Sequence, residues 1–215
     1  MRLQDIKGGI TEKEGECLKQ LASTCKYPIV EIGSYMGKST CYLGLGCLNA
    51  KVYAIDLWNM RLLPETIEKK RGKGKSKHDI IVVAQFTFPI DGSGNISDRV
   101  TIKTWEKFLW NIQQMGLEDK IIPVKGSSQE IAKVWTQEIG LLFIDGDHRY
   151  ENCLADYNGF AHNIVGGGYL ALHDYTGKYG YKVKQVVDEI IKPSGLWADW
   201  HVVDGLIVAT RKKII

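Results

Sequence analysis

The sequence predicts an α/β fold, a doubly wound and mostly parallel sheet with helices on both faces and one antiparallel strand at the C-terminus. Short apolar runs alternate with helical patterns along most of the 215 residues, as in repeated strand–helix–strand units. Glycines and polar residues follow the apolar runs, where such sheets carry their ligand sites. Two final apolar runs meet at Asp204 and Gly205, which predicts a closing hairpin with the antiparallel strand.

The first elements are signalled by a helix cap and by two apolar runs. Thr11 and Glu14 have the spacing of a capping box and are followed by an apolar stripe, which predicts a helix over 12–24. The next expected elements are a strand at 28–32, a helix at 37–48 and a strand at 51–56.

Residues 60–100 interrupt the alternation of strands and helices. Because the chain shows no second core, we expect one domain over 1–215 with 60–100 as an insertion or lid. Six cations and two glycines within 69–77 predict a solvated loop. The apolar segment 78–90 is interpreted as a short strand or flap.

Regular alternation resumes after residue 100. The expected elements are a helix at 101–115, a strand at 120–125, a helix at 128–136, a strand at 139–145, a helix at 149–163, a glycine turn at 166–168, a strand at 169–173, a helix at 181–192, and strands at 199–203 and 205–211.

Composition limits the environment and the partners. A net charge of +3 does not favour a nucleic-acid partner. No apolar run approaches the roughly 20 residues that span a bilayer, and no signal peptide is recognisable. Five cysteines without a C-x-x-C pair fit a reducing compartment, so we expect a cytoplasmic protein. The tryptophans that are candidates for the core or for a homodimer interface are Trp105, Trp110, Trp135, Trp197 and Trp200.

The loop after the first strand has the spacing of a ligand site. Gly33 and Gly37 lie four apart between an apolar run and a helical pattern. Gly37, Lys38 and Ser39 end like a P-loop, but the loop is one residue short, and Tyr35 breaks the dinucleotide pattern. The remaining pattern suits a ligand with a cationic or neutral head, or a tight turn that binds nothing.

Polar residues also stand at the ends of the later strands. Asp56 lies 23 residues after Gly33, where α/β folds bind ribose hydroxyls, although a solvated strand-end carboxylate is the alternative. After the third main strand come Ser127, Ser128 and Gln129, which have groups for an adenine edge. Ser127 with Glu130 also has the spacing of a capping box.

The last two strand ends carry the chemically strongest side chains. Asp145, Asp147 and His148 follow one strand, and His173 and Asp174 follow the next. Their carboxylates would repel one another unless compensated. A divalent cation, most simply Mg²⁺, would resolve this, and a set of hydrogen-bonded turn residues without metal is the alternative.

Together these segments resemble the Rossmann-like class I methyltransferases that use S-adenosyl-L-methionine. The resemblance covers about 10–210 and leaves 60–100 as a divergent insertion. Residues 31–39 look like the cofactor loop of the catechol-type O-methyltransferases, and 126–130 look like their adenine loop. Residues 143–151, with the later glycines and His173, look more like the macrocin and sugar O-methyltransferase branch.

The resemblance implies a role for each site residue. Asp56, with Leu57 beside it, would bind the ribose, and Ser127, Ser128 and Gln129 would border the adenine. Asp145, His173 and Asp174 would hold the divalent cation, with His148 in the position of the general base. The residues that would hold the methionine part are Glu31, Gly33, Ser34, Tyr35, Gly37, Ser39 and Asp145.

The implied reaction is methyl transfer to a hydroxyl of a small molecule, sugar or catechol-like. The basic segment 69–77 would favour an anionic acceptor if it closes as a lid. The Asn/Asp-Pro-Pro-Tyr/Phe clamp of amine and base methylases is absent. Two alternatives remain open, which are a non-catalytic S-adenosylmethionine-binding protein and a P-loop nucleotide hydrolase.

Overall fold

The computed structural model of the protein describes residues 1–58, 80–83, 86–89 and 104–213. By its internal contacts the chain divides into two compact units. The larger unit holds Met1–Leu57 together with Trp105–Ile215, and the smaller unit holds Trp58–Thr104.

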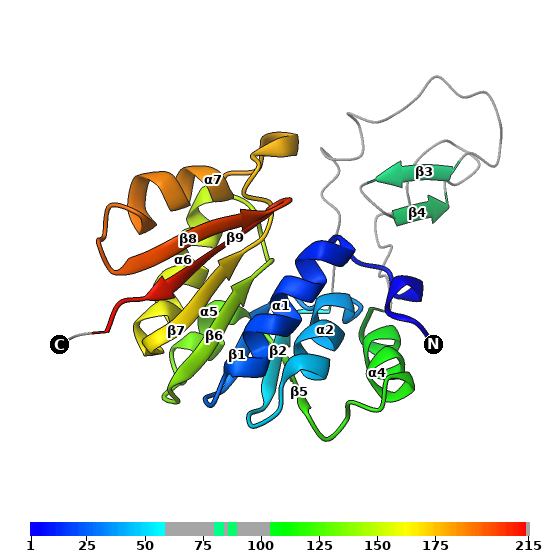
Figure 1. The fold of residues 1–215 in the computed structure, drawn as a ribbon. Helices are drawn as coiled ribbons and strands as arrows, with labels where there is room; N and C mark the ends of the chain where they lie inside the picture. Colours follow the sequence, from blue (N-terminus) through cyan, green and yellow to red (C-terminus); the bar gives the residue numbers. More distant parts are fainter. Residues whose placement is uncertain (59–79, 84–85, 90–103, 214–215) are drawn as a thin grey trace. The chain divides into compact units, whose positions relative to one another are not determined.

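A seven-stranded sheet forms the centre of the larger unit (Figure 1). Its strand order is β5-β2-β1-β6-β7-β9-β8. The neighbours from β5 to β7 pair in parallel, whereas β9 is antiparallel to both β7 and β8. The strands are β1 (Ile29–Ile32), β2 (Val52–Asp56), β5 (Ile121–Lys125), β6 (Ile139–Ile144), β7 (Ile164–Leu172), β8 (Trp197–Val203) and β9 (Leu206–Arg211). The predicted fold class is confirmed.

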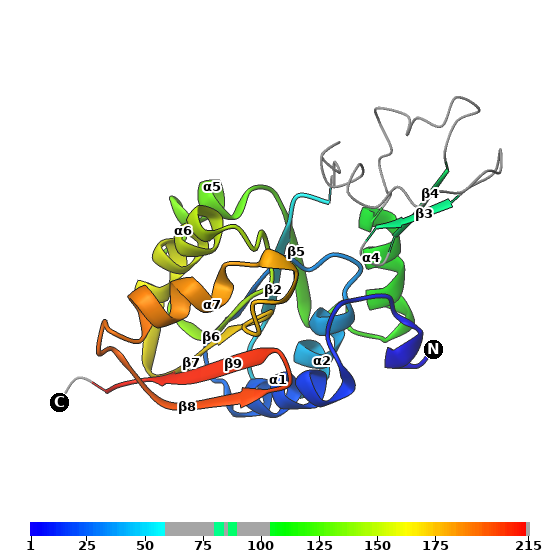
Figure 2. The same cartoon turned by 90° about the horizontal axis from the view of Figure 1, so that it is seen from above.

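Helices cover both faces of this sheet (Figure 2). Helices α1 and α2 lie on one face, and α5, α6 and α7 lie on the other. The helices are α1 (Glu12–Thr24), α2 (Lys38–Gly46), α4 (Thr104–Gln114), α5 (Ser128–Ala132), α6 (Tyr150–Phe160) and α7 (Val183–Val186). Short 3-10 turns cover Leu3–Asp5, Ala161–Asn163 and Lys178–Gly180, and a π-helical turn at Val187–Ile191 continues α7.

The start of α1 confirms the predicted capping box. The Glu14 backbone N–H donates to Thr11 Oγ1 at 3.2 Å, and the Thr11 N–H donates to Glu14 Oε2 at 2.7 Å. Two otherwise unsatisfied donors at the helix N-terminus are thereby paired.

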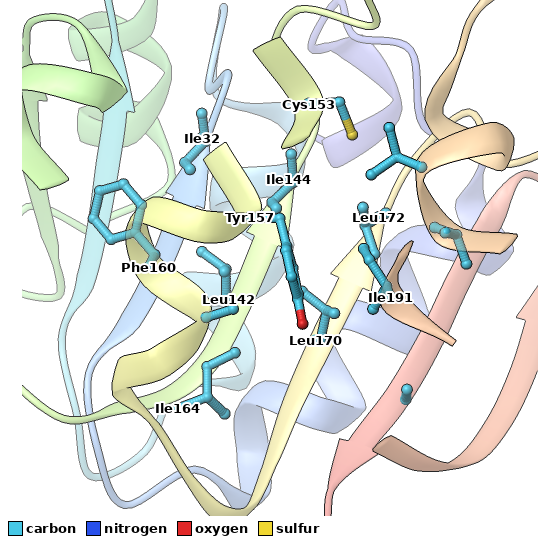
Figure 3. Close-up of a cluster of buried hydrophobic side chains, with 14 of the residues drawn as sticks. Ile32, Leu142, Ile144, Cys153, Tyr157, Phe160, Ile164, Leu170, Leu172 and Ile191 are labelled. Carbon is cyan, nitrogen blue, oxygen red and sulfur yellow. The ribbon is translucent and has the colours of Figure 1, made fainter. Parts of the chain in front are cut away.

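One hydrophobic cluster fills the space between the sheet and helices α6 and α7 (Figure 3). Strands β6 and β7 contribute alternate residues, as the two-residue period of a strand requires, and α6 contributes residues three and four apart. The labelled members are Ile32, Leu142, Ile144, Cys153, Tyr157, Phe160, Ile164, Leu170, Leu172 and Ile191. Each fully buried apolar side chain of this size stabilises the fold by about 1.5–3 kcal/mol.

Some tryptophans belong to this hydrophobic cluster, and others lie on the surface. Trp197 is buried in the cluster and donates from Nε1 to the Tyr157 hydroxyl at 3.0 Å, which ties β8 to α6. Trp135 packs against the cluster, whereas Trp110 is exposed. The tryptophans therefore divide between core and surface.

The structure differs from the sequence prediction in three places. The expected turn at 166–168 lies inside β7, which pairs with β6 through a register shift near Ile139. The helix expected over 128–136 ends at Ala132, and Ser127 makes no side-chain cap. The helix expected over 181–192 is divided into a short α-helix and a π turn. Local propensity was overridden here by strand pairing and by packing against the sheet.

The smaller unit contains one described element pair. Strands β3 (Ile80–Val83) and β4 (Phe86–Pro89) pair antiparallel, with Ile80 opposite Pro89. The basic segment 69–77 and the turn expected at 91–95 lie outside the described residues.

Candidate active site

The carboxyl ends of five parallel strands bring most of the predicted site residues to one edge of the sheet. The chain leaves β1 toward β2 on one side and later returns to β6 on the other side. Strand order therefore reverses between β1 and β6, which is where open α/β sheets form their ligand crevice. Ile32, Ile144 and Leu172 are in register, so the loops after β1, β6 and β7 begin at one level.

Gly33 joins two of these loops. Its φ of +91° lies in the region that favours glycine, and a Cβ there would stand 2.2 Å from the Asp145 carbonyl oxygen. The backbone after β1 thus lies directly on the backbone after β6. The loop glycine is required by this close backbone approach, whether or not a ligand is bound.

Asp56 lies against the same loop from the other side. Its Oδ2 accepts the Tyr35 backbone N–H at 2.8 Å, and the residue is partly exposed. The end of β2 is thereby fixed to the turn after β1. Leu57, the next residue, is 57% exposed.

Glu31 lies beneath the glycine loop rather than in it. It is fully buried, and its Oε2 accepts a short hydrogen bond from the Thr40 hydroxyl. Burial raises the pKa of Glu31 to about 7, although the neighbouring hydroxyls of Ser39, Thr40 and Ser34 act in the opposite direction. Its other oxygen, Oε1, is buried and has no hydrogen-bond partner among the described residues. The sequence had assigned Glu31 to the methionine part of the cofactor.

The start of α2 shows how the chain uses its P-loop-like residues. Gly37 is the N-cap, with φ of +87°. Lys38 Nζ donates to the Ile10 carbonyl at 2.7 Å, which ties the segment before α1 to α2. In a P-loop this amine would serve a phosphate. The structure therefore gives no support to the nucleotide hydrolase alternative.

The loop after β5 is held mainly through Ser128. Its hydroxyl donates to Asp156 Oδ1 on α6 at 2.6 Å, while Gln129 is exposed. Burial raises the pKa of Asp156 to about 6, against the effect of the Ser128 hydrogen bond. The expected capping box from Ser127 to Glu130 is wrong, because Ser127 makes no side-chain cap.

Asp145, His148 and Asp174 form one cluster at the ends of β6 and β7. One ligand atom from each lies within 4.8 Å of the other two. His148 Nε2 is 2.9 Å from Asp174 Oδ2 and 3.4 Å from Asp145 Oδ1. Although these distances suit ion pairs, this buried nitrogen is not aligned for a hydrogen bond with either carboxylate.

His173 lies next to this cluster and is engaged on both sides. Its Nδ1 is 3.1 Å from Asp145 Oδ1, and its Nε2 is 3.3 Å from Glu14 Oε2. With carboxylates at both ring nitrogens, His173 has no free lone pair for a metal. Glu14 was not among the residues that the sequence assigned to the site, since its capping-box spacing already explained it.

Charge compensation shapes the titration of these groups. Burial lowers the pKa of His148, but Asp145 and Asp174 outweigh it and raise that pKa to about 9. The pKa of His173 is raised likewise against burial, chiefly by Asp145. Burial works to raise the pKa of Asp174, yet the two imidazoles hold it below its usual range. Without a cation, the imidazoles serve as the counter-charges of the carboxylates.

The cluster fits a divalent cation. Two carboxylates and one imidazole are a donor set for Mg²⁺, Mn²⁺ or Fe²⁺. The buried His148 Nε2, which lacks an aligned hydrogen-bond partner, would be the nitrogen ligand. This set differs from the predicted one, since His148 takes the place of His173. Asp147 is not part of it, because its carboxylate is paired with Arg149.

A tyrosine that the sequence did not single out packs on His148. The ring of Tyr181 stacks on the imidazole with centroids 4.3 Å apart and an interplanar angle of 18°. The Lys182 N–H also donates to the His148 carbonyl at 2.9 Å. The segment before α7 therefore holds the loop that carries His148.

The comparison with protein families agrees with this geometry. Residues 30–175, which include every loop named above after β1, β2, β5, β6 and β7, match the family described as a methyltransferase domain. The chain belongs to this methyltransferase family. The resemblance to class I methyltransferases inferred from the loop motifs is therefore confirmed.

Solved structures share the fold of this methyltransferase at low sequence identity. An O-methyltransferase from Bacillus cereus, in complex with SAH, has a TM-score of 0.61 at 15% identity, over 97% of this chain and 86% of its own. TomG, an O-methyltransferase from Streptomyces achromogenes in complex with SAM, has a TM-score of 0.61 at 12% identity, with coverages of 95% and 82%. An rRNA methylase from Streptococcus thermophilus has a TM-score of 0.58 at 12% identity, over 96% and 100%. The shared fold thus serves more than one kind of acceptor.

Among the residues that the structure describes, no helix combines the length and apolar character needed to cross a membrane.

Proposed function

We propose that this methyltransferase uses S-adenosyl-L-methionine to methylate a hydroxyl of a small molecule, sugar or catechol-like, with a divalent cation bound beside the cofactor. The observation that carries the proposal is the cluster of Asp145, His148 and Asp174 next to the loop at Gly33. The family fixes the transferred group, and this cluster favours a hydroxyl acceptor. The O-methyltransferases of Bacillus cereus and Streptomyces achromogenes support the same choice.

The cofactor would lie across the loops after β1, β2 and β5. Asp56 is fixed by the Tyr35 N–H at the end of β2, where a carboxylate can accept the hydroxyls of a ribose. The exposed Leu57 would lie beside the ribose, Gln129 would border the adenine, and the backbone between Gly33 and Gly37 would border the methionine part. Glu31 would act from below, by fixing the start of α2 through Thr40.

Asp145, His148 and Asp174 would hold the cation. When bound, a divalent cation lowers the pKa of an acceptor hydroxyl and orients it. Because His148 Nε2 faces both carboxylates, we assign this imidazole to the cation site rather than to proton removal, the role first inferred for it. Tyr181 would keep the imidazole in that orientation.

Methyl transfer then requires mainly alignment. The acceptor oxygen attacks the methyl carbon, the carbon–sulfur bond breaks with its electron pair going to sulfur, and the hydroxyl proton leaves to solvent. The loops at Gly33 and Asp145 touch each other, so cofactor and acceptor would be held by one continuous backbone surface. Such positioning supplies much of the rate increase of a bimolecular transfer.

The test has a binding arm and a turnover arm. Calorimetry with S-adenosylhomocysteine should show one site per chain. Transfer of a labelled methyl group should be measured on sugars, catechols and ribosomal RNA, with Mg²⁺ and with EDTA. The proposal expects a small hydroxyl acceptor and activity that EDTA removes. Absence of S-adenosylhomocysteine binding would overturn it, and transfer to RNA alone would replace the acceptor class.

Substitution of His148 tests whether this imidazole is a cation ligand or a general base. We expect His148→Ala to weaken Mn²⁺ binding about 10–100-fold while S-adenosylhomocysteine affinity stays within about two-fold. Lys182→Ala, an exposed neighbour whose backbone contact is retained, is the matched control. If His148→Ala binds Mn²⁺ normally but loses turnover, the imidazole acts as a base instead.

The acceptor and the setting are further parts of the proposal. The cations of 69–77 favour an anionic acceptor. All five cysteines are free thiols, which suits a reducing cytoplasm. The preference for an anionic acceptor is tested by comparing methyl transfer to a phosphorylated or carboxylated acceptor with transfer to its neutral analogue.

A further inference from the structure

We propose that Glu14, in the first turn of α1, is a positioning residue that holds His173 against Asp145 and so fixes the carboxylate that the cation would share. The contact between Glu14 and His173 stands on the structure alone, and its consequence for the cation rests on the proposed function. Glu14 and His173 are 159 residues apart in the chain.

Glu14 is built into this position by hydrogen bonds from three segments. Its side chain is 2% exposed. Oε1 accepts the Gly205 N–H at 2.7 Å, and Oε2 accepts the Thr11 N–H at 2.7 Å and faces His173 Nε2 at 3.3 Å. One buried carboxylate therefore connects the cap of α1, the hairpin turn between β8 and β9, and the end of β7. A capping box alone would need only the contact with Thr11.

The ring of His173 is held between two acceptors. Ionised carboxylates accept but do not donate hydrogen bonds, so Glu14 requires a proton on Nε2 and Asp145 requires one on Nδ1. Hydrogen bonds at both ring nitrogens therefore fix the plane and the position of the imidazole.

The surrounding chain restricts the same ring. A Cβ at Gly9 would lie 3.8 Å from His173 Cε1, so the N-terminal segment passes over the imidazole edge. That segment is held by Lys38, which donates to the Ile10 carbonyl, and by Thr11 Oγ1, which donates to Asp204 Oδ2 at 2.9 Å. His173 is therefore bordered by an N-terminal segment that Lys38 and the turn between β8 and β9 hold in place.

The contact between Glu14 and His173 affects the candidate cation site because both imidazoles lie close to Asp145 Oδ1. The same oxygen lies 3.1 Å from His173 Nδ1 and 3.4 Å from His148 Nε2. Losing the orientation of His173 would free this carboxylate to rotate. Residues that orient metal ligands in this way typically change metal affinity 10–100-fold when they are removed.

The experiment follows the ring protons of His173 and the binding of Mn²⁺. Nitrogen-15 NMR of the wild-type protein should show both His173 ring N–H groups protected from solvent exchange. Glu14→Gln keeps the side-chain volume and one acceptor oxygen, but it removes the charge and places an amide donor where the other carboxylate oxygen stood. We expect it to lose the protected Nε2–H signal and to bind Mn²⁺ about 10–100-fold more weakly, with S-adenosylhomocysteine affinity within about two-fold.

Thr11→Ala is the matched control, because it removes the cap and the Asp204 contact without touching His173. It should lower the unfolding temperature but leave the His173 signals and the Mn²⁺ affinity unchanged. Unchanged His173 signals in Glu14→Gln would overturn the proposal. A wild-type Nε2 that carries no proton would do the same, even if the variant failed to fold. If the wild type binds no Mn²⁺, the cation site fails, and the ring signals still decide the role of Glu14.

Discussion

At the scale of single residues, the site depends on a few positions where the backbone or a buried charge leaves little choice. Gly33 is one, because two loops touch through it. Asp156 is another, because its carboxyl group is buried beneath the loop after β5. Both positions can be tested by stability measurements without knowledge of the acceptor.

Gly33→Ala should destabilise the protein by about 2–4 kcal/mol, because a side chain at φ +91° is strained and its Cβ would collide with the Asp145 carbonyl. Gly116→Ala is the matched control, since its φ is +65° and a Cβ there meets nothing within 4 Å. We expect the control to cost about 1 kcal/mol. Urea unfolding of both variants measures the difference, and equal losses would contradict the close approach of the two loops.

Asp156→Asn should stabilise the protein more at neutral pH than in acid. The folded pKa of Asp156 is about 6 against an ordinary value of 3.8. Below the ordinary value both states are protonated and nothing is lost. As pH rises toward 6, the unfolded chain ionises first, so the wild type loses on the order of 2 kcal/mol of stability that the variant keeps.

Urea unfolding of wild type and Asp156→Asn between about pH 4 and pH 7 provides the measurement. The amide oxygen retains an acceptor for the Ser128 hydroxyl, so the packing of the loop is kept. A difference in unfolding free energy that stays constant with pH would show that Asp156 titrates normally in the folded protein.

At the scale of secondary-structure elements, the site is positioned by contacts between elements that are distant in sequence. Strand β8, at the edge of the sheet, is fixed to α6 by Trp197 and Tyr157. Helix α6 in turn holds the loop after β5 through Asp156 and Ser128. Loosening one of these contacts should therefore weaken the support of the loop after β5.

Tyr157→Phe should destabilise the protein by about 1–3 kcal/mol, because it leaves the buried Trp197 Nε1–H without its acceptor. Tyr53→Phe is the control, since the Tyr53 hydroxyl hydrogen-bonds the exposed Gln137 side chain. A change below about 0.5 kcal/mol is expected there. Thermal unfolding of the two variants gives the comparison, and similar stability would mean that water replaces the lost partner.

At the scale of the whole molecule, the candidate ligand surface exists only in the folded chain. Loops from β1, β2, β5, β6 and β7 meet at one edge of the sheet, so S-adenosylhomocysteine should bind the native state alone. At about 100 times its dissociation constant it should stabilise the fold by about 2.7 kcal/mol. For a chain of this length that raises the unfolding temperature by roughly 5–10 °C.

A thermal melt series with S-adenosylhomocysteine tests this expectation, with adenosine triphosphate at the same concentrations as the control. The Lys38 amine is bound to the Ile10 carbonyl, so the triphosphate should give little shift. Equal shifts from both compounds would point to a general nucleotide site rather than a methyl-donor site.

Local patterns in the sequence predicted the alternating elements, the antiparallel closing strand, the α1 cap and the polar strand ends, because these depend on periodicity and turn chemistry along short stretches. Those patterns also identified Asp145, His148, His173 and Asp174 as one neighbourhood. The resemblance gave His173 the role of a cation ligand and His148 that of the general base, whereas the geometry favours His148 for the cation.

Only the tertiary structure decided how the two imidazoles differ. His148 Nε2 lies 3.4 Å from Asp145 and 2.9 Å from Asp174, and Tyr181 stacks on its ring. His173 Nδ1 lies 3.1 Å and 3.6 Å from the same carboxylates, but Glu14 has reached its second nitrogen. The same holds for Gly33, whose constraint comes from a carbonyl more than a hundred residues later. Periodicity in the sequence indicates which face of an element is buried. The assignments above depend instead on which distant backbone or carboxylate packs against that face. Only the packing of the folded chain determines which one does.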